Sequence, residues 1–183
     1  MTWTGGSNVV IKKSIVSSFL KELSKRVNPL GINVYVTSGY RSPEDQVRVV
    51  CNNYLNTGGS NLSVYGQRTG DMYREHCPDN KPALVEYETI KLKNRMDKDP
   101  EYQGHGSALA VDLRVSNLSN SKKLEYKKVL ESMGAKVLWE HHPEHFHVWV
   151  GSYSPPIPWS RYALLGSTFV LIGALTYRYY IDT

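Results

Sequence analysis

The sequence predicts an α+β fold, in which helices flank a small, mostly antiparallel sheet and a transmembrane helix ends the chain. Helical and strand patterns interleave, yet the strand patterns are few and their connections vary in length. This arrangement disfavours a doubly wound parallel sheet. The 183 residues are enough for one compact domain with a hydrophobic core. A long apolar run near the C-terminus predicts the transmembrane helix.

The first half of the chain predicts a helix, a strand and a second helix. Apolar residues recur at helical spacing over residues 13–27, and residues 28–31 (Asn-Pro-Leu-Gly) end that helix. Residues 32–37 alternate and are rich in β-branched side chains, which predicts a strand. Ser42 is the expected N-cap of the second helix, with Pro43 at its first position, and that helix runs to about residue 54.

The second half begins with a long polar segment. Residues 56–82 show no periodicity, and we expect a functional or mobile loop there. Beyond it, the patterns predict helices at 83–96 and 121–133, and strands at 108–115, 136–140 and 146–150.

The C-terminal residues differ from the rest of the chain. Residues 152–158 contain three prolines and predict a stiff, extended linker. The following apolar run reaches the roughly 20 residues that a bilayer requires, with aromatic residues placed as interface anchors. A buried or interfacial helix is the alternative. The predicted organisation is therefore a folded domain at 1–151, a linker at 152–160 and a single transmembrane helix at 161–181.

Charge narrows the expected partners. The net charge of +5 favours anionic surroundings, such as a cell-wall polymer or lipid head groups. Lysines and arginines are scattered rather than interleaved with aromatics, so we expect no nucleic-acid partner. Residues 1–6 lack the charged and apolar regions of a secretory signal.

Two cysteines are too few for a disulfide framework. One bridge between Cys51 and Cys77 is conceivable, but the sequence alone cannot establish it. Cys51 shares a helical face with Val47, Val50 and Tyr54, and we expect it to be a buried core thiol.

Candidate metal ligands lie between residues 104 and 151. His105 and Asp112 open this stretch, and Glu144, His145 and His147 close it. Two histidines and a carboxylate are good zinc ligands, and three protein ligands leave a fourth position for water. A carboxylate near the metal can act as the general base that a zinc hydrolase needs.

Strand periodicity limits how these residues can be arranged. His145 and His147 are two apart on a predicted strand and therefore project from the same face. His105 and Asp112 are seven apart, so His105 must lie in the turn before its strand. Alternatives remain open: His141 or His142 could supply a ligand in a shifted register, and Glu140 could replace Glu144 as the base. His76 is expected to be a surface residue.

Three ordered blocks resemble a known superfamily. They are residues 38–42 (Ser-Gly-Tyr-Arg-Ser) with Gln46, the block from His105 to Asp112, and residues 144–147 (Glu-His-Phe-His). Together they span about 110 residues and resemble the zinc D-Ala-D-Ala carboxypeptidases and L-alanyl-D-glutamate endolysins. Lysostaphin-like enzymes and the hedgehog domain belong to the same superfamily.

The resemblance implies a role for each matched residue. It implies zinc as the cofactor, Glu144 as catalytic base and His145 as a hydrogen-bond donor in the transition state. It further implies Arg41 as the cation near the substrate, although Arg41 could be a simple salt-bridge partner. The implied zinc ligands are His105, Asp112 and His147. We expect Ser38, Tyr40 and Gln46 to contact the substrate together with Arg41, although Tyr40 could equally be a packing residue and Gln46 could orient Arg41 or be solvated.

The expected function is that of a membrane-anchored zinc peptidase that cleaves peptide stems or cross-links of bacterial peptidoglycan. An endopeptidase is favoured over a D,D-carboxypeptidase. The C-terminal anchor without a secretory signal suggests a bacteriophage lysis or virion-associated enzyme in a virion or host membrane. The alternative is a membrane-anchored, zinc-stabilised binding module that has lost catalysis.

Overall fold

A computed structural model of the chain describes residues 3–102, 104–141 and 143–155. A five-stranded sheet stands at the centre of these residues, in the order β1-β2-β3-β5-β4. The strands are β1 (Thr4–Gly5), β2 (Tyr35–Ser38), β3 (Ala110–Arg114), β4 (Lys136–His141) and β5 (Glu144–Trp149). Strand β1 is parallel to β2, and every other pairing is antiparallel.

The predicted fold class needs correction on two points. The sheet is mixed, because β1 adds a parallel edge; with only two residues, β1 is too short to leave a periodic pattern in the sequence. In addition, no helix within the described residues is long and apolar enough to cross a bilayer. The predicted transmembrane helix at 161–181 lies outside the described residues, as does most of the predicted linker.

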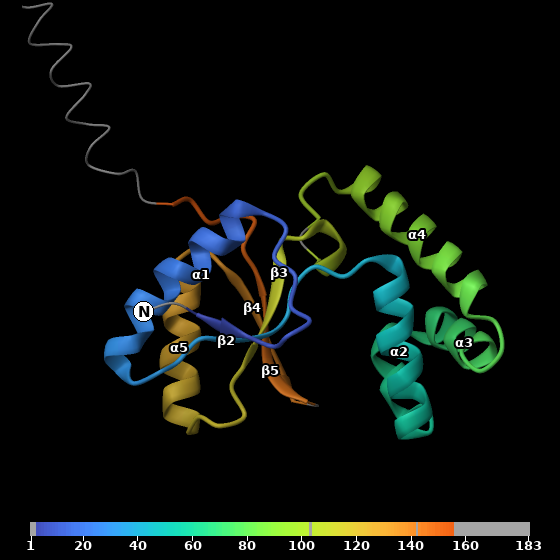
Figure 1. The fold of residues 1–183 in the computed structure, drawn as a ribbon, viewed down its shortest axis with the longest axis horizontal. Coiled ribbons are helices and arrows are strands. Elements are labelled where there is room, and N and C mark those ends of the chain that lie inside the picture. The colour runs from blue at the N-terminus through green and yellow to red at the C-terminus, as the bar shows by residue number, and fades with distance from the viewer. Residues whose placement is uncertain (1–2, 103, 142, 156–183) are drawn as a thin grey trace, which may run out of the picture. The chain divides into compact units, whose positions relative to one another are not determined.

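Helices α1 (Ser14–Val27) and α5 (Asn120–Ser132) cover one face of the sheet, as Figure 1 shows. Phe19, Leu20 and Leu23 of α1 are completely buried in the main core. Phe146 and Val148 of β5 enter the same core from the sheet. The helix predicted at 13–27 is thereby confirmed, since the apolar stripe of α1 is the surface that the sheet buries.

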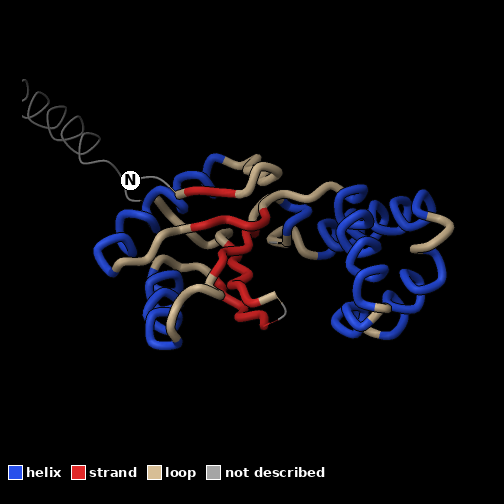
Figure 2. The backbone as a smooth tube through the Cα atoms, turned by 60° about the horizontal axis from the view of Figure 1, so that its bottom comes forward, coloured by secondary structure: helices blue, strands red, loops and turns tan. Residues whose placement is uncertain are grey.

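Helices α2 (Pro43–Thr57), α3 (Gln67–His76) and α4 (Lys81–Lys98) lie on the other side of the sheet (Figures 1 and 2). The predicted cap of α2 is confirmed, because the Ser42 side chain accepts a hydrogen bond from the Asp45 backbone N–H at 3.2 Å. These helices have a second core of their own, made of Val47, Val50, Cys51, Leu62, Tyr73, Cys77 and Leu84.

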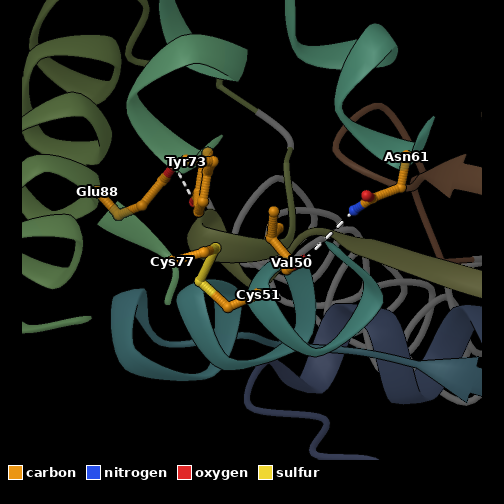
Figure 3. The surroundings of a disulfide bond; sticks show 6 residues. All are labelled: Val50, Cys51, Asn61, Tyr73, Cys77 and Glu88. Carbon is orange, nitrogen blue, oxygen red and sulfur yellow. Dashed lines mark hydrogen bonds between the residues drawn. A yellow bond between two sulfur atoms is a disulfide. The ribbon is translucent and has the colours of Figure 1, made fainter. Parts of the chain in front are cut away.

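The prediction of a loop at residues 56–82 is wrong. A 3₁₀ helix at Ser60–Tyr65 and helix α3 occupy most of it. Tyr73 of α3 is buried and donates a hydrogen bond to Glu88 of α4 at 2.6 Å (Figure 3). Tyr73 is the one large side chain that α3 buries, which leaves no apolar stripe in the sequence. Packing against α2 and α4, rather than an amphipathic pattern of its own, therefore stabilises α3.

The two cysteines form a disulfide, Cys51–Cys77, which joins α2 to the residue after α3 (Figure 3). Cys51 is buried as expected, but it is not the free thiol that we expected. The helical pattern around Cys51 shows only that this cysteine points inward. Its disulfide partner, Cys77, is brought close by the packing of α3, a helix that the sequence pattern did not predict.

Tyr126 of α5 provides a test of the main core. Its hydroxyl is buried, and among the described residues it has no hydrogen-bond partner. Its ring packs against Phe146 with centroids 5.8 Å apart. Tyr126→Phe keeps this packing and removes the unpaired hydroxyl, so we expect the free energy of unfolding to rise by about 1 kcal/mol. Urea denaturation of both proteins measures this, and a loss of stability would mean that the hydroxyl has a partner.

Candidate metal centre

Three side chains from three elements meet on the face of the sheet opposite α1 and α5. His105 lies in a 3₁₀ turn, His105–Ser107, just before β3; Asp112 is on β3 and His147 on β5. Antiparallel pairing places Asp112 directly opposite His147. Their ligand atoms all lie within 4.8 Å of one another, so this group could hold a metal ion. The expected position of His105 in the turn is confirmed.

The spacing of the donor atoms fits a small tetrahedral ion. His105 Nε2 lies 3.2 Å from Asp112 Oδ1 and 3.2 Å from His147 Nδ1. Asp112 Oδ1 and His147 Nδ1 are 2.7 Å apart. Ligands about 2.0–2.1 Å from a tetrahedral zinc ion lie roughly 3.3 Å from one another. The three atoms are therefore arranged much like one face of such a tetrahedron, and two imidazoles with one carboxylate suit zinc.

Neighbouring groups orient two of the three ligands, His105 and Asp112. His105 Nδ1 donates to the carbonyl oxygen of Gly39 at 2.6 Å, which leaves its Nε2 for the group. Position 39 requires glycine, because a Cβ there would collide with the carbonyl oxygen of Val10. Arg41 donates from Nη2 to Asp112 Oδ2 at 3.3 Å, and the same arginine lies 3.4 Å from Gln46 Oε1. Such outer partners fix the direction of metal ligands.

Asp112 is held as a carboxylate. Burial raises its pKa, but the neighbouring His105 and His147 imidazoles outweigh burial and hold the pKa well below its usual range. An ionised carboxylate is the form that binds a cation.

His145 and Glu140 lie beside the ligand group. Alternation along β5 places His145 on the same face as His147, as predicted, while Phe146 and Val148 are buried on the other face. Strand pairing sets Glu140 of β4 opposite His145. His145 Nε2 is 3.4 Å from Glu140 Oε2 and 3.6 Å from Asp112 Oδ1. These two side chains flank the group on the side of the β4–β5 turn.

Glu144 is not brought to the group. It projects from the opposite face of β5, where Lys123 of α5 donates to both of its carboxylate oxygens at 2.8 and 2.9 Å. The Trp139 indole N–H donates to it as well, at 3.2 Å. The hydrogen bond from Lys123 lowers the pKa of Glu144, whereas a general base would benefit from a raised one. The base role expected for Glu144 therefore has no geometric support, and the alternative carboxylate Glu140 is on the correct face.

A groove of about 500 Å³ opens onto the ligand group. His105, His147 and Trp149 line it on the sheet side, and Lys91 and Arg95 line it from α4. Of the four expected substrate contacts, only Arg41 and Gln46 line this groove. Ser38 is used in pairing with β3, and Tyr40 packs under Lys12, whose Nζ lies 3.4 Å from the ring centroid.

The remaining histidines are elsewhere. His141 stacks on Trp139 on the Glu144 face of β4, with ring centroids 5.3 Å apart. His76 ends α3 and lies 3.8 Å from Glu75. His142 is outside the described residues. Helix α4 is the part of the groove that sequence reasoning missed, because nothing in its pattern indicates that it faces the sheet.

Comparisons give this site no external assignment: no family model matches the chain, and neither the curated proteins nor the solved structures yield a match.

Proposed function

We propose that this chain is a zinc-dependent peptidase that hydrolyses peptide bonds in the stems or cross-links of bacterial peptidoglycan. The observation on which the proposal rests is the triangle of His105 Nε2, His147 Nδ1 and Asp112 Oδ1, with edges of 2.7 to 3.2 Å, at the wall of an open groove. The resemblance of three ordered sequence blocks to zinc peptidases of cell walls supports the choice of metal and substrate.

The ligand group would supply the electrophilic part of the chemistry. When bound, zinc polarises a carbonyl oxygen and lowers the pKa of a water molecule. The groove on one side of the group leaves room for an extended peptide between β5 and α4. Glu140 and His145 on the other side are the proton-exchanging side chains that share the face of the ligands.

We assign the general-base role to Glu140. Its side chain is 44% exposed, so it can reach water beside the group, and no lysine or arginine lies within salt-bridge distance of it among the described residues. His145 donates from Nδ1 to the carbonyl oxygen of Pro143 at 2.6 Å, which points its Nε2 at Glu140 and Asp112. In its imidazolium form, with both ring nitrogens protonated, His145 can donate a hydrogen bond from Nε2 to the oxygen that becomes negative in the transition state.

A second candidate, a metal-stabilised module without catalysis, is favoured by one observation. Glu144, the base that the resemblance implies, is bound to Lys123 away from the site. A structural metal site needs no base, and Glu144 would then be a simple ion-pair partner. The two candidates differ in whether the zinc-loaded protein hydrolyses a peptide at all.

Arg41 gives a test that separates orientation from substrate contact. Its guanidinium holds Asp112 Oδ2, so Arg41→Ala should weaken zinc affinity by about 10–100-fold as well as lower activity. Arg41→Lys should restore only part of both, because an ammonium cannot bridge Asp112 and Gln46 with a planar fork. Competition with a zinc-binding dye measures the affinity. Unchanged affinity together with a raised KM would assign Arg41 to substrate alone.

The function itself is tested with defined muropeptides. The full-length chain, loaded with zinc, is incubated with cross-linked and uncross-linked muropeptides. The products are then separated by chromatography and their masses are measured by mass spectrometry. We expect two fragments that together exceed the substrate by the mass of one water, and none after chelation. Intact muropeptides with a zinc-loaded, folded protein would instead support the non-catalytic module.

A further inference from the structure

A second hollow of about 600 Å³ lies along α4. Tyr87, Ile90 and Asn94 line it from one stripe of that helix, at helical spacing. Ile90 is 51% exposed, which is high for an isoleucine on a helix of a folded domain. The Thr69 and Tyr87 hydroxyls are 3.1 Å apart and join α3 to α4 beneath it. The hollow thus lies in the helical part, and Tyr87 and Ile90 give it apolar surface.

The rim of this hollow is strongly basic. Asp99 is the single carboxylate in its lining. Four cationic side chains line it as well: Arg68, Lys91, Arg95 and Lys98. Lys91 donates to Glu88 at 3.1 Å, but within the described part of the chain no carboxylate lies within salt-bridge distance of the other three. By contrast, Arg48 and Arg74 on α2 and α3 each pair with an aspartate three residues earlier. Unneutralised charge around a concave surface favours an anionic ligand.

The hollow shares part of its lining with the groove at the metal group. Lys91 and Arg95 line both, so the C-terminal half of α4 forms a crest between them. A ligand that lies in the hollow and crosses this crest would enter the groove in which His147 stands. A short peptide held in the groove alone would not reach Arg68 or Lys98, since neither lines the groove.

From this arrangement we infer that the hollow along α4 is a binding site for an anionic, carboxylate-bearing stretch of the cell-wall polymer, which presents its peptide to the neighbouring groove. This inference rests on the proposed function for the identity of the polymer. Arg68, Arg95 and Lys98 supply the attraction, and Tyr87 and Ile90 supply apolar surface for sugar or alkyl groups. Attraction between exposed charges weakens as salt is added.

Sedimentation with insoluble peptidoglycan sacculi tests the site without turnover. The full-length chain is first stripped of metal with a chelator. The double variant Arg68→Glu/Lys98→Glu reverses two rim charges that are not in the groove. The matched control is Lys21→Glu/Lys128→Glu, which reverses two exposed lysines on α1 and α5, on the opposite face of the sheet. Both variants carry the same net charge.

We expect wild type and control to sediment alike, and the rim variant to bind about tenfold more weakly, because two attractive charges at the hollow become repulsive. Added salt should release the wild type. Equal binding by the two double variants would overturn the inference. Binding to vesicles of phosphatidylglycerol that the rim variant loses and the control keeps, without such rim-dependent binding to sacculi, would assign the hollow to a lipid surface and overturn it as well. Because sedimentation needs no catalysis, an inactive protein with rim-dependent binding would contradict the proposed function and leave this inference standing.

Discussion

Glu140→Gln is expected to abolish turnover while zinc stays bound. The amide is nearly isosteric with the carboxylate but cannot accept a proton, so kcat on a muropeptide should fall by about 10²–10⁴-fold. Glu140 is not one of the three ligands, and its only described ionic contact is to His145, 3.4 Å away. Zinc content and melting temperature should therefore change little.

The matched control is Glu144→Gln, four residues further along the chain. This substitution takes the counter-charge from Lys123, a lysine that is only 6% exposed, so the melting temperature should fall. Turnover per folded molecule should be kept, because Glu144 faces α5 and not the ligand group. The opposite pattern, with Glu144→Gln inactive and Glu140→Gln active, would restore the base implied by the sequence blocks and contradict our assignment.

Removing any one ligand is expected to remove the metal. His105→Ala, Asp112→Ala and His147→Ala each leave two donors of the triangle, which cannot close a zinc site, so stoichiometric zinc should be lost together with activity. Zinc should raise the melting temperature of the wild type, since a ligand that binds only the folded state stabilises it, and should not do so in these variants.

His76→Ala is the control for this series, because it removes a histidine that lies next to Glu75 at the end of α3 and is no member of the group. It should keep one zinc per chain by elemental analysis. Full zinc occupancy in any one of the three ligand variants would remove that residue from the set of ligands.

Local signals in the sequence predicted most of the regular elements. Helix α2 begins where Ser42 and Pro43 indicate, and α1 buries the stripe that its periodicity defines. The two-residue strand β1 and helix α3 left no such signal, because pairing with β2 and packing on α4 stabilise them. Tertiary contacts of that kind are absent from any local pattern.

The position of the ligand group could be predicted, whereas the position of Glu144 away from it was not. The predicted strand began at residue 146, so its periodicity did not extend to Glu144; in the structure Glu144 and His147 are three residues apart on β5, and this odd separation places them on opposite faces. Finding Glu140 required the register of the β4–β5 hairpin, in which Glu140 pairs with His145. The separate strand patterns at 136–140 and 146–150 do not define that register, because it is set by the pairing of β4 with β5.

The most direct test of the central claim is a crystal structure of the zinc-loaded protein with anomalous diffraction recorded at the zinc absorption edge. Our account predicts one anomalous peak within bonding distance of His105 Nε2, His147 Nδ1 and Asp112 Oδ1, on the sheet wall of the groove. A peak bound elsewhere, or three unligated side chains in crystals that contain excess zinc, would contradict it.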